Sequence, residues 1–136
     1  MALDAAEDAR PIRPGDRLLA PMCLTLAVWL LHLRFGRVVA IARWGMGRCR
    51  RPARADEATR MVTAVHNAAR HRGGRMACLE CSLATVIMAS FGRRSVQWCI
   101  GARLMPYASH AWIEVDGHPV QTFEHPDRPY HVLLRL

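Results

Sequence analysis

The sequence predicts an α+β fold in a single domain, with helices first and a small antiparallel sheet after them. Apolar residues recur at helical spacing up to about residue 91, and alternation of apolar and polar residues replaces that spacing from Val96 onward. The dipeptide Asp116-Gly117 is typical of a hairpin turn between two such strands. A chain of 136 residues is long enough to bury a core without cross-links.

The first part of the chain predicts three helices. An apolar run at 18–33 follows Asp16, which we expect to cap the first helix, and a second run occupies 38–46. An arginine-rich link at 47–55 follows, and apolar residues then recur at helical spacing from Ala58 to Ala69. The run at 18–33 contains Pro21 and ends in charged residues, so it is too short to span a bilayer. We expect a buried helix there and no membrane association.

The second part predicts one more helix and then strands. Leu79, Leu83, Val86 and Ile87 form a helical stripe, and Gly92 is expected to end that helix as a C-terminal glycine. Strands are expected around 96–100, 109–115 and 119–124, with no internal repeat. Because side chains alternate between the two faces of a strand, His110, Trp112 and Glu114 of the middle strand should share one face of the sheet.

Charge and cysteine content limit the function classes. The net charge is +8 and all 19 basic residues are arginines, but they are scattered along the chain. Scattered arginines favour a solvated basic surface, so no nucleic acid partner is expected. The start of the chain lacks the basic-then-apolar order of an export signal, so we expect a cytoplasmic protein with reduced thiols at Cys23, Cys49, Cys78, Cys81 and Cys99.

Cys78 stands at the expected start of a helix, where unpaired backbone N–H groups and the helix dipole favour a thiolate. His110, on a strand, supplies a base, and the two together are the general requirement for acyl transfer to a thiol. Other interpretations stay open at this point. Cys78 and Cys81 could be a redox pair, although no core strand precedes them, or half of a zinc site, although no second ligand pair has suitable spacing. Cys78 could also be inert core.

Three stretches resemble a known family: "CLECSLA" (78–84), "IGARLMPYASHAWIEVDGHPV" (100–120) and "YHVLLRL" (130–136). They are similar to the lasso peptide biosynthesis B2 proteins, a branch of the transglutaminase-like, papain-related superfamily. The resemblance is good from about Glu57 to the C-terminus and looser in the N-terminal third. It implies a transglutaminase-like core at 56–136, with a nucleophile helix packed on a small antiparallel sheet. Residues 1–55 would then be an apolar helical region packed on that core or docking to it.

The resemblance also implies an activity. Cys78 would be the nucleophile and His110 the general base and acid of a cysteine peptidase that cuts the leader from a ribosomally made precursor, with no cofactor and no metal. Cys81 would be incidental. The third member of the triad, an acid that orients the histidine, cannot be assigned in the same way, because the family position falls on Thr122, which is not an acid.

A hairpin loop one register longer would place Glu124 opposite His110, so we take Glu124 as the orienting acid. Asp116 is explained by the turn, and Gln121 would be an amide alternative on the wrong face of its strand.

Partners follow from the same resemblance. We expect the leader region of the precursor as substrate, a separate winged-helix precursor-recognition protein, and an ATP-dependent lasso cyclase acting downstream. The N-terminal helices and their basic residues could dock the recognition protein or an acidic leader, or simply form core. Two other functions stay open, namely transglutaminase-type acyl transfer to an amine and an inactive peptide-binding module of the same fold.

Overall fold

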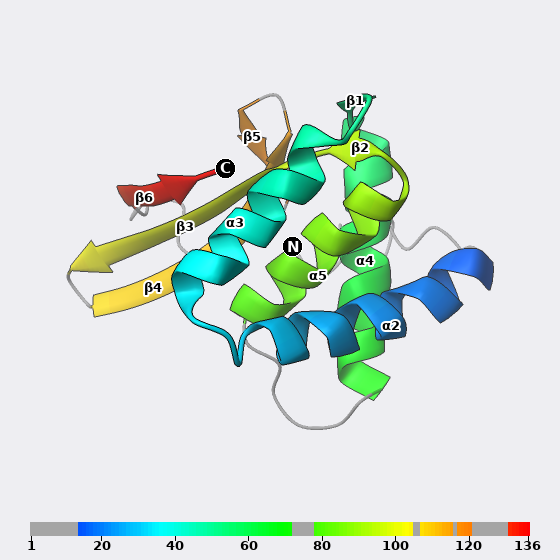
Figure 1. The fold of residues 1–136 in the computed structure, drawn as a ribbon, viewed down its shortest axis with the longest axis horizontal. Helices are drawn as coiled ribbons and strands as arrows, with labels where there is room; N and C mark the ends of the chain where they lie inside the picture. Colours follow the sequence, from blue (N-terminus) through cyan, green and yellow to red (C-terminus); the bar gives the residue numbers. More distant parts are fainter. Residues whose placement is uncertain (1–13, 72–77, 105–106, 116, 121–130) are drawn as a thin grey trace, which may run out of the picture.

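The computed structural model describes residues 14–71, 78–104, 107–115, 117–120 and 131–136. The described elements run in the order α2 (Pro14–Leu30), α3 (Phe35–Gly47), β1 (Arg51–Pro52), α4 (Ala55–His71), α5 (Cys78–Phe91), β2 (Arg94–Ser95), β3 (Gln97–Leu104), β4 (Tyr107–Val115), β5 (His118–Pro119) and β6 (His131–Arg135). The predicted α+β class, with helices preceding a small antiparallel sheet, is confirmed (Figure 1).

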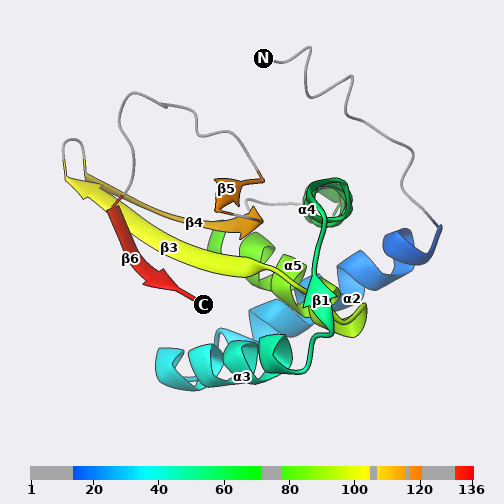
Figure 2. The ribbon, with the colours of Figure 1, turned by 90° about the horizontal axis from the view of Figure 1, so that it is seen from above.

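Helix α5 forms the centre of the molecule. Figure 2 shows β3 and β4 on one side of it and α2 and α3 on the other. The sequence predicted a one-sided stripe, but the six consecutive residues 81–86 are all buried. Small and hydroxyl side chains such as Ser82, Ala84 and Ala89 let neighbouring elements approach the helix closely from several directions, so that it is covered nearly all round.

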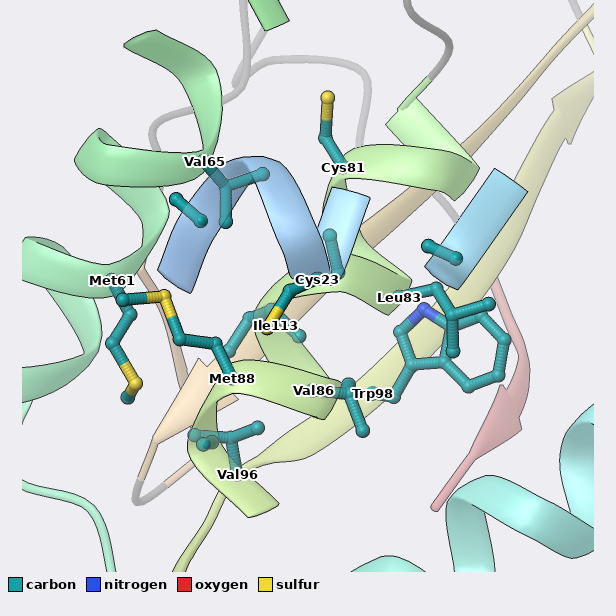
Figure 3. Close-up of a cluster of buried hydrophobic side chains, with 14 of the residues drawn as sticks. Cys23, Met61, Val65, Cys81, Leu83, Val86, Met88, Val96, Trp98 and Ile113 are labelled. Atoms are coloured by element: carbon teal, nitrogen blue, oxygen red, sulfur yellow. The ribbon is translucent and has the colours of Figure 1, made fainter. Parts of the chain in front are cut away.

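The core joins all parts of the described chain. Figure 3 shows Cys23 of α2, Val65 of α4, Val86 of α5 and the strand residues Trp98 and Ile113 in one cluster. The Trp98 indole Nε1 donates a hydrogen bond of 2.9 Å to Ser82 Oγ, and both side chains are buried. This bond ties β3 to the middle of α5.

Helix α2 differs from the expectation of a buried helix. Its inner face is buried, but Leu18, Met22 and Trp29 on its outer face are 75%, 67% and 70% exposed. The helix begins at Pro14, so Asp16 lies in its first turn and does not cap it; the Asp16 carboxylate forms an ion pair of 3.3 Å with Arg60 of α4. No helix among the described residues is long and apolar enough to cross a membrane.

The four-stranded sheet has the order β5-β4-β3-β6 and is antiparallel throughout. The predicted hairpin is present: Val115 pairs with His118, and Gly117 in the turn has a φ of 77°, a conformation that glycine adopts without strain. Strand β6 pairs with the other edge of β3, with a register shift between Ile100 and Gly101.

The end of α5 differs in detail from the prediction. The helix ends at Phe91, but the left-handed residue is Arg93, with a φ of 55°, and not Gly92. The Arg93 carbonyl accepts a hydrogen bond of 3.1 Å from the Arg50 backbone N–H, which starts the unpredicted parallel pairing of β1 with β2. Glu57 then binds Arg51 of β1 and Arg94 of β2 through its two carboxylate oxygens, at 3.1 and 3.2 Å, and so fastens this pair to α4.

Candidate active site

Cys78 is the first residue of α5, where the sequence placed it. The first N–H groups of a helix have no partner within the helix, and the helix dipole favours negative charge there. The backbone at this position can therefore support a thiolate and the oxyanion of an acyl-transfer intermediate. The side chain of Cys78 itself lies outside what the structure describes.

His110 lies in β4, directly opposite Gly101 of β3. Its ring is half-buried and stacks on the indole of Trp112, with 5.7 Å between ring centroids and 15° between planes. Because Gly101 has no side chain, the cross-strand neighbour leaves room beside the imidazole. The stack restricts the ring to a narrow range of orientations.

Trp112 is in turn held by a charged group that sequence reasoning gave no role. Its Nε1 donates a hydrogen bond of 2.7 Å to Glu114 Oε2, and both side chains are 4% exposed. The other oxygen of Glu114 accepts a hydrogen bond of 3.0 Å from Arg135 of β6. Strand alternation had placed Trp112 and Glu114 on the face of His110, but Arg135 was missed because it lies 21 residues beyond Glu114.

The face of the sheet that carries His110 is turned away from the body of α5. Trp98, which bonds to Ser82 of α5, pairs with Ile113, so the Ile113 face is the one that packs on the helix. Alternation then puts His110 and Trp112 on the opposite face. A contact between Cys78 and His110 must therefore be made around an edge of the sheet and not through its middle.

The outer edge of β4 offers that route. Among the described residues, β5 pairs only with Glu114 and Val115, so no described strand lies beside His110 on the side away from β3. Figure 1 shows the first turn of α5 on the β4 side of the sheet, with β6 on the other side. This edge of β4 is the one nearer the start of α5, and we expect the predicted nucleophile and base to meet there.

The proposed third member lies outside the described residues, as do Thr122, Gln121 and Asp116. The register of the hairpin nevertheless defines the condition under which Glu124 could lie opposite His110. Val115 pairs with His118, and the Val120 N–H donates a hydrogen bond of 2.9 Å to the Ile113 carbonyl. Placing Glu124 opposite His110 needs a register one residue longer, as a β-bulge after Val120 would supply. Glu124 stays a prediction under that condition.

The other cysteines differ from Cys78 in position. Burial raises the pKa of the Cys23 thiol to about 11, and burial also raises the pKa of Cys49. Burial raises the pKa of Cys99 as well, against an opposing hydrogen bond from Arg135. Cys81, one turn into α5, is 7% exposed and belongs to the core, as its incidental role would require. No group of three His, Cys, Asp or Glu side chains able to hold a metal ion occurs in the described part of the chain.

Comparison with known proteins defines the family. A model described as the transglutaminase-like superfamily matches residues 22–135, which include helices α3 to α5, most of α2, and the whole sheet. Searches of curated proteins and of solved structures found no match. The family match includes both Cys78 and His110 and spans the boundary expected at residues 55 and 56. The fold is one compatible with cysteine peptidase or acyltransferase activity, and the chain belongs to the transglutaminase-like superfamily.

Proposed function

We propose that the protein is a cysteine peptidase that removes the leader from a ribosomally made lasso peptide precursor. The observation that supports this most is the position of Cys78 at the first residue of α5, within a transglutaminase-like match that also contains His110 on the adjacent sheet. The similarity of the 78–84 and 100–120 stretches to lasso peptide B2 proteins supplies the substrate class. The reaction would take place in the cytoplasm, where the thiol stays reduced.

The proposed mechanism assigns each proton. His110 accepts the proton of the Cys78 thiol, and the thiolate attacks the scissile carbonyl while backbone N–H groups at the start of α5 bind the oxyanion. His110 then gives the proton to the leaving amine, which frees the C-terminal product and leaves a thioester. Water, deprotonated by His110, attacks the thioester and expels the Cys78 thiolate, which takes the proton back from His110. The leader is released as an acid that ionises in water. Glu124 would orient His110 and balance its charge.

Partners belong to the same proposal. A separate winged-helix recognition protein would bind the leader and present the scissile bond, and an ATP-dependent cyclase would close the ring on the freed N-terminus. Since orientation of the bond would come from the recognition protein, the chain alone should cut slowly and the complete system quickly.

The test is to incubate the purified chain with the precursor, with and without the recognition protein, and to weigh the products. Loss of the leader mass, strongly accelerated by the recognition protein, is the expected result. If an added amine becomes joined to the precursor with loss of ammonia, or to the leader with loss of the C-terminal product, the protein is an acyl transferase. If the precursor mass never changes, the chain is an inactive binding module of the fold.

A further inference from the structure

The outer face of α2 carries an apolar stripe that nothing in the described structure covers. We define the α2 stripe as the four residues Leu18, Met22, Leu26 and Trp29, whose spacing of three and four residues aligns them along one side of the helix. Their side chains are 75%, 67%, 42% and 70% exposed. The opposite side of the helix is buried through Ala20, Cys23, Leu24 and Ala27.

A helix that is apolar on all sides is normally buried on all sides. From Leu18 to Leu31 the helix has no charged residue, and the stripe continues past its end into Leu33, which is 40% exposed. Thr25, the polar residue of this face, donates its hydroxyl to the Pro21 carbonyl of the same helix at 2.9 Å. A row of large exposed apolar side chains of this kind marks an interaction surface.

The charged residues that follow Asp16 along the chain have one sign as far as residue 55. Asp16 pairs with Arg60, and from residue 17 to residue 55 the chain contains no Asp or Glu. The charged residues in that interval are all arginines: Arg17, Arg34, Arg37, Arg43, Arg48, Arg50, Arg51 and Arg54. Arg17 borders the stripe at its start and Arg34 follows it, and both are exposed. Arginines at both ends of the stripe favour an anionic partner.

We infer that the α2 stripe docks on a bilayer surface that carries anionic phospholipid headgroups. The stripe would enter the boundary between headgroups and acyl chains, with α2 parallel to the surface and the flanking arginines on the phosphates. Trp29 suits that depth, since its ring is apolar and its N–H can remain in the wet layer. In Figure 2, α2 and α3 lie on the side of α5 away from β3 and β4, so the sheet that carries His110 is separated from α2 by α5.

Two other occupants fit the observations less well. A specific protein interface carries about one hydrogen bond per 100–200 Å². The stripe has no polar side chain, and the hydroxyl of the neighbouring Thr25 donates to the Pro21 carbonyl of the same helix. A second copy of this chain would bring another net charge of +8 against the same arginines. The hydrocarbon of a bilayer needs no hydrogen bonds from the stripe, and an anionic headgroup layer attracts the flanking arginines and does not repel them.

The experiment is flotation of the full chain with vesicles. Vesicles of phosphatidylcholine mixed with phosphatidylglycerol are compared with pure phosphatidylcholine, and the mixed ones are tested in low and high salt. The protein is expected to float with the mixed vesicles in low salt, with a blue shift of tryptophan emission. Replacing Leu18, Met22 and Trp29 together by Ser should weaken binding by about tenfold or more for each side chain removed. Phe91→Ser, which removes an exposed apolar side chain from the end of α5, is the matched control and should bind as the parent does.

Arg34→Gln combined with Arg37→Gln should weaken binding in low salt and reduce its dependence on phosphatidylglycerol. High salt should weaken binding of the parent in the same way, because salt screens the attraction between arginine and phosphate. The inference is overturned if the parent binds no vesicles, if it binds neutral vesicles equally well, or if the stripe variant binds as the parent does. A dimer seen by light scattering without vesicles, and lost in the stripe variant, would assign the face to a second copy instead. None of these results depends on peptidase activity, so they leave the proposed function to its own test.

Discussion

Single thiols in this protein differ in how readily they can ionise. A buried thiol stays protonated at neutral pH, and the raised pKa values of Cys23, Cys49 and Cys99 follow from burial. Cys78 instead stands at the start of a helix, where backbone N–H groups and the helix dipole favour a thiolate. The proposed nucleophile is therefore the cysteine whose position gives the strongest backbone support for a negative charge.

Alkylation by iodoacetamide at pH 7 should label Cys78 before the other four cysteines. For Cys23, with a pKa of about 11, the thiolate fraction is negligible at pH 7 and increases only as the pH rises toward that value. Mass mapping of peptides after short exposure gives the order of labelling. A label found first on Cys81 or Cys99, in the folded protein, would remove the reason for choosing Cys78.

Glu114 is expected to position His110 through Trp112. Glu114→Ala leaves the Trp112 N–H without its acceptor, so the indole and the imidazole stacked on it should lose their fixed orientation. We expect kcat to fall about tenfold with little change in KM, since a base that is displaced affects the chemical step. Glu114→Gln keeps an oxygen acceptor and should recover most of the loss. Equal activity in the parent and Glu114→Ala would show that the stack has no part in catalysis.

The face shared by His110, Trp112 and Glu114 could be read from alternation in "SHAWIEV", because the register of β4 has no irregularity against β3. The role of Arg135 could not, since the contact joins β4 to β6 across a strand that lies between them in the sheet. Glu124 was assigned from an assumed loop length, which local sequence does not determine. Val115 pairing with His118 shows that the assumed register needs an additional residue.

Helices and strands with regular patterns were predicted closely, and short or buried ones were not. The helix α4 and the β4–β5 hairpin follow from spacing and from Asp116-Gly117. The two-residue strands β1 and β2 lie in an arginine-rich link and after a helix, where no alternation exists to indicate them. Burial of α5 on nearly all sides was not predicted, because which sides are covered depends on distant elements.

The attachment of the sheet to α5 can be tested through Ser82. Ser82→Ala leaves the buried Trp98 N–H without its acceptor, and we expect a loss of about 1–3 kcal/mol in the free energy of unfolding. Ser90→Ala is the matched control in the same helix, because the Ser90 hydroxyl donates its hydrogen bond to the Val86 carbonyl of α5 itself and not to a strand. Urea denaturation followed by circular dichroism gives both values. Similar losses in the two variants would mean that the Trp98 bond contributes little.

The molecule has one hydrophobic core to which α2, α4, α5 and the sheet all contribute. Sequence composition suggested a division near residue 55, and that division stays a prediction. The outer side of α2 could not be predicted, since hydropathy reports that a residue is apolar and not whether anything covers it. Exposure of Leu18, Met22 and Trp29 is a property of the assembled fold.

The thiol at the start of α5 is proposed to cut the leader from its precursor. The measurement is the initial rate of leader removal, in the presence of the recognition protein, for the parent, Cys78→Ala and Cys81→Ala, each checked for folding by circular dichroism. We expect Cys78→Ala to retain less than about a thousandth of the parent rate, because the nucleophile is removed. Cys81→Ala should retain most of it, because Cys81 is buried in the core one turn away from the start of the helix. Equal loss in both folded variants would instead assign the activity to the cysteine pair, and full activity of Cys78→Ala would contradict the account altogether.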